Sequence, residues 1–265
     1  MFHPRPEPDA TAPSTSGKRG AAGAIGAALL AVAAKSKALL VVLKALPFAK
    51  VLLTFGTFGL SILAYGMRNG LAFGFGFAML LMVHEVGHGL AMHDAGIRAG
   101  WPVFIPFFGA FIAMKDQPAH PTIEARIAYA GPIAGTAASL LCAAVGLFLH
   151  RPFFLALAYV GFFMNLFNLV PLGFLDGARI ARVFSRGAWV VGIILLGALF
   201  FVSPSPQLAI IAVMGLVQVF RRSNDDLDQV SDAQRRIWAF RYFGLCFFLG
   251  AATFFTHELL ERRGF

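Results

Sequence analysis

Two histidines and a glutamate stand at metal-ligand spacing inside an apolar stretch of this 265-residue chain. The motif is His84-Glu85-Val86-Gly87-His88, and residues 73–83 before it and 89–92 after it carry no charge. Histidines four residues apart lie on one face of a helix, one turn apart, where both can bind a single zinc ion. The glutamate between them can act as a base toward water that the metal activates. Ionisable side chains are costly in lipid, so three together predict a functional site.

A catalytic zinc usually has three protein ligands and one open position, so a third donor is needed. His93 follows His88 by five residues, which puts it about 140° away from the ligand face of a helix. His120 lies near prolines in an expected loop, and His150 lies at the far end of an expected span. None of these three histidines is therefore a favoured ligand.

Asp176 is the favoured third ligand. It follows an apolar span whose end we expect at the depth of the histidines, and Pro171 and Gly173 release it from helical geometry. Its carboxylate could then reach His84 and His88. The alternative is that Asp176 caps a short helix that begins at Gly177, and both roles could hold together.

The composition indicates an all-α polytopic membrane protein with about six or seven transmembrane helices. The chain is 58% hydrophobic and 13% charged, whereas soluble domains average about 25% charged residues. The net charge of +9 does not indicate nucleic-acid binding, because the basic residues flank apolar segments and form no single patch with aromatics. Cys142 and Cys246 lie in apolar runs without a partner at ligand spacing, so we expect them to be packing residues.

Apolar runs and polar breaks divide the chain into four regions. We expect a disordered polar tail at 1–20, an interfacial basic amphipathic segment at 21–50, a catalytic transmembrane core at 51–186 and further transmembrane helices at 187–265. A short first span at 21–34 is an alternative. The expected spans are residues 51–67, 70–93, 126–149, 152–170, 188–202, 207–220 and 237–256.

Residues 101–114 are apolar but contain two prolines, which disfavours a straight helix. They predict a membrane-dipping hairpin near the active site, with extended arms that meet at Gly109. Such irregular backbone is tolerated at that depth only against protein or a wet cavity. We expect that cavity to be the active site. The small residues of the segment 131–135 (Gly-Pro-Ile-Ala-Gly) predict close helix packing.

The distribution of Lys and Arg predicts the orientation in the membrane. With the N-terminal tail in the cytoplasm, Arg68 and Arg151 lie in external connections and most other basic residues lie in internal ones. Arg262 and Arg263 are a minor exception. We therefore expect a multi-pass protein of a bacterial cytoplasmic membrane, with its active site toward the cytoplasm.

Two motifs together resemble the site-2 protease family of intramembrane zinc metalloproteases. They are His84-Glu85-x-x-His88 and Asn168-x-x-Pro171-x-x-x-x-Asp176-Gly177, and the resemblance extends over about residues 70–182. It implies one zinc ion per chain, held by His84, His88 and Asp176, with Glu85 as the base. Asn168 matches a position for substrate or oxyanion contact. Asn165, one turn earlier, is a second candidate or a helix-packing amide.

The resemblance implies a minimal family member, one without a PDZ or CBS domain. Residues 94–125 are too few for a PDZ domain, and residues 221–236 cannot form a CBS domain. It implies a zinc-dependent endopeptidase that cleaves transmembrane segments, in regulated intramembrane proteolysis or in clearance of signal-peptide remnants. The expected partners are a transmembrane protein or peptide and the lipid bilayer. The alternative is a non-proteolytic membrane scaffold or chaperone, which predicts loss of Glu85 or a ligand. A metal transporter would need ionisable residues along several spans, which are nearly absent here.

Overall fold

The computed structural model describes residues 49–202, 204–206, 208–213 and 227–262. The chain divides into two units, residues 1–50 and 51–265, and the second carries nearly all of the described elements. The expected polar tail and almost all of the expected interfacial segment lie outside the described residues.

The described part of the chain is mostly helical, as expected for an integral membrane protein. Four of its helices are long and apolar enough to cross a membrane: α2 (Ala49–Asn69), α3 (Leu71–Asp94), α4 (Pro121–Phe148) and α9 (Asp232–Glu261). Two apolar helices are shorter, α5 (Pro152–Asn168) and α7 (Ala188–Val202). The expected count of six or seven spans is therefore not established, and residues 214–220 of the expected sixth span lie outside the described residues.

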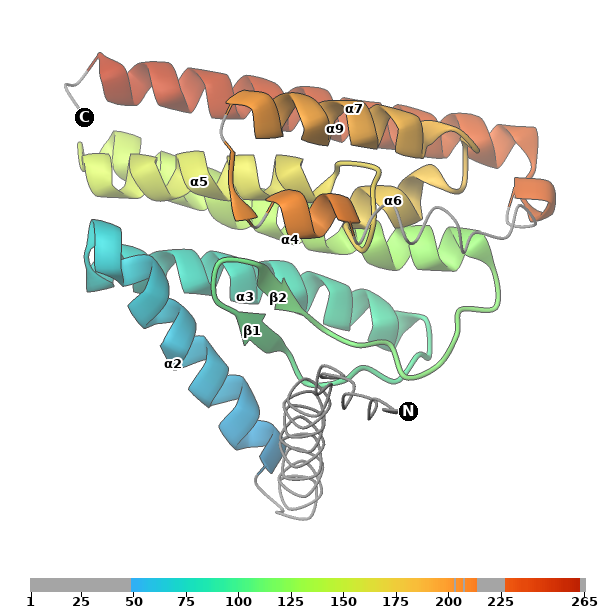
Figure 1. Ribbon diagram of the computed structural model, residues 1–265, viewed down its shortest axis with the longest axis horizontal. Helices are drawn as coiled ribbons and strands as arrows, with labels where there is room; N and C mark the ends of the chain where they lie inside the picture. Colours follow the sequence, from blue (N-terminus) through green and yellow to red (C-terminus); the bar gives the residue numbers. More distant parts are fainter. Residues whose placement is uncertain (1–48, 203, 207, 214–226, 263–265) are drawn as a thin grey trace, which may run out of the picture. The chain divides into compact units, whose positions relative to one another are not determined.

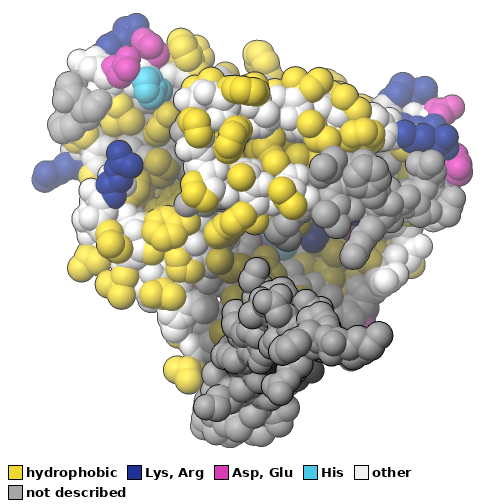
Figure 2. All heavy atoms as spheres, viewed as in Figure 1, with side chains coloured by type: hydrophobic (Ala, Val, Ile, Leu, Met, Phe, Trp, Pro, Cys, Tyr) yellow, Lys and Arg dark blue, Asp and Glu magenta, His cyan; other side chains and the backbone are white. Residues whose placement is uncertain are grey.

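The surface has the polarity that a bilayer requires. Figure 2 shows apolar side chains over the broad middle of one face, with charged side chains gathered toward the two ends of the helices. Large apolar side chains are exposed on several helices, among them Phe55 on α2, Phe201 on α7 and Phe247 on α9. Exposure of this kind is costly in water, so these faces suit lipid.

The helix that carries the histidine motif, α3, packs against α4, α4 packs against α5, and α5 packs against α9 (Figure 1). Small residues allow the close approach that the sequence predicted. A Cβ atom on Gly87 would lie 2.6 Å from the carbonyl oxygen of Ala130, and one on Gly135 would lie 2.6 Å from Nδ2 of Asn165. The main apolar core lies among α4, α5 and α9, and it includes Ala128, Phe162 and Leu249.

The expected hairpin is present as two short antiparallel strands, β1 (Val103–Ile105) and β2 (Gly109–Phe111). Its turn differs from the expectation that the arms meet at Gly109, which instead begins β2 opposite Ile105. The Phe108 N–H donates to the Ile105 carbonyl, and Phe107 has φ 66°. Proline at the second position and positive φ at the third are the features of a type II turn, so the chain reverses at 106–108.

Hydroxyl groups on α2 hold this hairpin. Thr54 Oγ1 donates to the carbonyl of Pro102, and Thr57 Oγ1 accepts from the N–H of Phe104. The Tyr65 hydroxyl accepts from the N–H of Phe107, and the two rings make an edge contact. These bonds satisfy backbone groups that would otherwise be unpaired in an apolar setting, and they offset the strain of a positive φ at phenylalanine.

An ion pair closes the base of the hairpin. The side chain of Arg98 donates from Nε and Nη2 to the carboxylate of Asp116, and its own backbone N–H donates to the same group. This geometry holds the pKa of Asp116 at about 2, below its usual value, because the charged form receives these bonds. The 17 residues between the pair are thereby tied into one loop.

Candidate active site and metal centre

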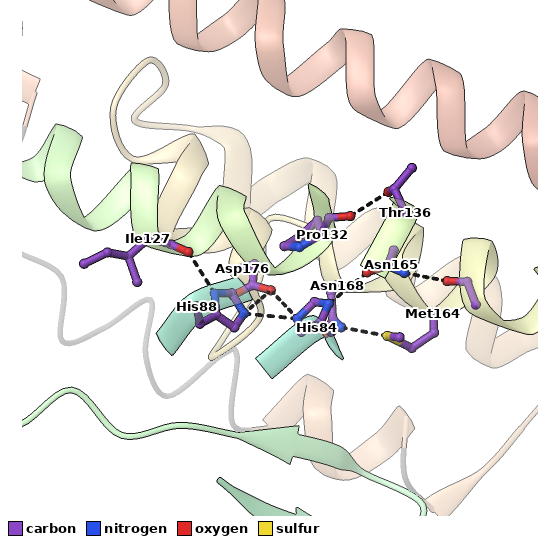
Figure 3. Close-up of polar contacts among 10 residues, drawn as sticks. His84, His88, Ile127, Pro132, Thr136, Met164, Asn165, Asn168 and Asp176 are labelled. Atoms are coloured by element: carbon purple, nitrogen blue, oxygen red, sulfur yellow. Dashed lines mark hydrogen bonds and ion pairs between the residues drawn. The ribbon is translucent and has the colours of Figure 1, made fainter. Parts of the chain in front are cut away.

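The two motif histidines project from α3 with their ring orientations fixed by neighbouring helices (Figure 3). Nδ1 of His84 lies 2.8 Å from Oδ1 of Asn165 on α5, and Nδ1 of His88 lies 2.8 Å from the carbonyl oxygen of Ile127 on α4. A carbonyl oxygen only accepts, so both Nδ1 atoms carry the proton. Both Nε2 atoms are then left with a lone pair, which is the form that binds a metal.

Asp176 completes a triangle of donor atoms. Its Oδ2 lies 3.2 Å from Nε2 of His84 and 3.3 Å from Nε2 of His88, and the two Nε2 atoms lie 3.1 Å apart. All three side chains are buried. Three converging lone pairs without protons between them repel unless a cation lies among them. Ligands about 2.05 Å from a tetrahedral zinc would be about 3.3 Å apart, so the donor set fits this ion.

The capping role considered for Asp176 is not observed. Asp176 is the first residue of the short helix α6 (Asp176–Ala181), and Leu175 stands at its N-cap without a side-chain bond. The other histidines weighed as ligands lie elsewhere: His93 and His150 are exposed, and His120 caps α4 through a bond from the Thr122 N–H. The structure thus brings together Asp176 and the two histidines of α3.

Glu85 lies beside the two histidines and is 4% exposed. Its Oε2 atom is buried and has no hydrogen-bond partner among the described residues. The backbone N–H of Ile112, which follows β2, is directed at this carboxylate. A buried carboxylate oxygen without a partner is costly. This atom is therefore available to a group that enters the site, such as a water molecule.

A cavity of about 630 Å³ opens beside these four residues. Its walls are largely apolar and come from α3, α5, the hairpin and the segment around α7. They include Phe77, Phe163, Phe167, and hairpin residues from Phe107 to Met114. The hairpin lines a cavity, as the sequence predicted, and the apolar walls of this cavity suit an apolar polypeptide segment.

The two candidate asparagines have different surroundings. Asn165 is fully buried, and its Nδ2 donates to the carbonyl of Gly161, which directs Oδ1 at His84. Both ends of this amide are engaged, which favours a role in orienting His84. Asn168 lines the cavity, and its Nδ2 lies 3.4 Å from the sulfur of Met164. A thioether is a weak acceptor, so Asn168 retains donor capacity for a substrate.

The motif match is supported by comparisons with known proteins. Residues 72–151 match the family described as peptidase family M50, the family of the site-2 proteases. Over these residues, which carry the first motif, the chain is similar to that family. It is similar to EGY2, a chloroplastic protein of Arabidopsis thaliana named as a zinc metalloprotease, with 28% identity over 43% of this chain and 29% of that protein.

A second relative is Rip3 of Mycobacterium tuberculosis, also named as a zinc metalloprotease. It is 31% identical over 39% of this chain and 28% of its own length. EGY1 of Arabidopsis thaliana is 38% identical over 28% of this chain and 15% of its own length. The chain thus matches less than a third of the length of each of these relatives.

Two parts of the site were not identified from the sequence. The carbonyl of Ile127, which orients His88, belongs to the backbone and leaves no residue-type signal. Gly131 was assigned only to helix packing, yet a Cβ atom on it would collide with the His88 ring. The small residues of segment 131–135 were the signal that could have revealed this role of Gly131. A helix surface with small residues leaves room for the ring of a metal ligand as well as for another helix.

Proposed function

We propose that this chain is a zinc-dependent intramembrane endopeptidase that cleaves transmembrane segments of membrane-protein substrates. The observation that supports it most directly is the triangle of donor atoms from His84, His88 and Asp176, 3.1–3.3 Å apart. These three residues would hold one zinc ion per chain. Glu85 has its partnerless oxygen beside them, and the adjoining cavity has apolar walls.

The chemistry is hydrolysis of a peptide bond. When bound, zinc would act as a Lewis acid and lower the pKa of water. Glu85 would accept a proton from the attacking water and later donate it to the leaving amine. Asn165 and the Ile127 carbonyl would keep Nε2 of each histidine free of protons. The Asn168 amide would donate to the substrate carbonyl oxygen as negative charge develops on it.

The substrate must be unwound before it can react, because a helix hides its own carbonyls. The hairpin could hold the unwound segment, since residues 107–114 line the cavity and the backbone N–H of Ile112 is directed at Glu85. An extended peptide could add to the free edge of a strand by main-chain hydrogen bonds. The cavity walls would take its apolar side chains.

The location proposed for this reaction is the cytoplasmic half of a bacterial cytoplasmic membrane. The pattern of Lys and Arg around the spans supports this orientation. The substrates would be the membrane anchor of a regulatory protein or the remnant of a signal peptide.

The test compares the wild-type chain with Glu85→Gln and with the control Glu258→Gln, which lies near the end of α9 and pairs with Arg262. Each protein is purified in detergent, its zinc content is measured, and cleavage of a single-pass model peptide is followed by mass spectrometry. We expect about one zinc per chain in all three, with cleavage lost only in Glu85→Gln. A protein that binds zinc and the peptide without cleaving it would instead favour the scaffold function, and a folded protein without zinc would refute the proposal.

A further inference from the structure

The cavity contains a cationic side chain that the proposed reaction does not use. Among the described residues that line it, Arg179 is the sole Lys or Arg, and most of the other lining side chains are apolar. Its side chain is 30% exposed. A charge on an apolar wall attracts an oppositely charged ligand more strongly than the same charge does in bulk water.

Arg179 stands close to the expected site of cleavage. It belongs to α6 and follows Asp176 by three residues, so the two side chains are neighbours on the helix surface. Residues three apart in a helix have Cα atoms about 5 Å apart. An extended peptide advances by about 3.3 Å per residue. A side chain about two to four residues from the scissile bond would therefore reach the Arg179 guanidinium.

Among the described residues, Arg179 has one acidic partner, Glu124. Nε of Arg179 lies 3.8 Å from Oε1 of Glu124, and Nη1 of Arg182 lies 3.6 Å from Oε2 of the same carboxylate. At 3.8 Å the first contact is an ion pair without a hydrogen bond. One carboxylate thus faces two guanidinium groups. A guanidinium that shares its carboxylate partner in this way can bind a second carboxylate through two parallel N–H···O hydrogen bonds.

We propose that Arg179 is a specificity-determining residue that binds an acidic side chain of the substrate. The substrate class is then a transmembrane segment with an Asp or Glu about two to four residues from the scissile bond. This inference rests on the proposed function. A purely structural role, in which Arg179 only ties α6 to α4 through Glu124, makes no prediction about the charge of the substrate.

The test uses peptides that differ in one side chain. Mass spectrometry first maps the cleavage site in an uncharged transmembrane peptide, and Glu, Gln or Lys is then placed at each position two to four residues from it. Cleavage is measured with wild type, Arg179→Gln and Arg179→Glu. Arg182→Gln is the matched control, since it shares Glu124 but does not line the cavity. Binding of the same peptides is measured with Glu85→Gln alone and combined with each Arg179 variant.

At one or more positions we expect wild type to have a KM about tenfold lower for the Glu peptide than for the Gln peptide, as a charged hydrogen bond would give. Arg179→Gln should lose this preference, Arg179→Glu should prefer the Lys peptide, and kcat on the Gln peptide should change little. Equal use of all peptides by wild type, or equal loss of preference in Arg182→Gln, would overturn the inference. Charge-dependent binding without cleavage by wild type would refute the peptidase function and the stated substrate class, and would leave standing only the contact between Arg179 and an acidic side chain.

Discussion

Replacement of Gly131 by alanine should weaken zinc binding strongly without unfolding the protein. Gly131 faces the ring of His88, and an added Cβ atom would lie 2.8 Å from Cδ2 and still closer to Nε2 and Cε1. Ordinary contact begins at about 3.4 Å. The methyl group is fixed to the backbone of α4 and cannot turn away, so the histidine ring must move.

The size of the effect follows from the required movement. The ring must retreat by about 1 Å, which would also strain the Nδ1 bond to the Ile127 carbonyl. Metal–ligand distances tolerate only about 0.2 Å, and loss of an outer partner alone costs about 10–100-fold in affinity. We therefore expect zinc affinity to fall by at least about a hundredfold, or about 2.7 kcal/mol.

The assay is a zinc competition titration with a chromogenic chelator, combined with thermal unfolding of the metal-free protein. Gly89→Ala is the control, since it lies on the same helix as His88 and, within the described part of the chain, its Cβ would meet only the Ile112 side chain, at 3.6 Å. We expect Gly89→Ala to bind zinc as wild type does. Wild-type zinc affinity in a folded Gly131→Ala protein would refute the assignment of His88 as a ligand in this geometry.

Three further predictions follow from the site and the hairpin. Asn165→Leu should weaken zinc binding by about 10–100-fold in the same titration, because His84 loses the acceptor that orients it; unchanged affinity would contradict this role. Asn168→Ala should bind zinc as wild type does and lower kcat by about a hundredfold in the peptide cleavage assay. Loss of zinc from this variant would instead show that Asn168 supports the metal site rather than the substrate. The folded-state pKa of Asp116 is lowered to about 2 from 3.8, so its ion pair stabilises the hairpin at higher pH and is lost as pH falls through about 2. A carboxyl ¹³C NMR titration should have its midpoint near 2 in wild type and nearer 3.8 in Arg98→Gln; equal midpoints would exclude the ion pair in solution.

The sequence alone predicted the elements that carry strong local signals. Long apolar runs predicted α2, α3, α4 and α9, because burial of the backbone in lipid demands helices of that length. Two prolines predicted the hairpin at 101–114. Its turn was misplaced by a few residues, because Pro106 followed by a strained Phe107 reversed the chain where glycine was expected.

The residue types of the site were also readable from the sequence. The i, i+4 spacing placed His84 and His88 on one helix face, a geometry that any α-helix provides. Asp176 was favoured by elimination and by its place after a span. The sequence could not supply the distance between Asp176 and His84, which are 92 residues apart, because that distance depends on how α3, α4 and α5 pack.

The sequence by itself therefore determined the chemistry that this protein has available: two imidazoles, two carboxylates and the apolar helices around them. Only the tertiary structure decided which atoms meet. It placed Oδ1 of Asn165 beside Nδ1 of His84, packed Gly131 against the His88 ring and brought Arg179 to the cavity wall. The physical reason is that local periodicity fixes which face a residue occupies, whereas the axial register between helices is set by side-chain packing over the whole interface.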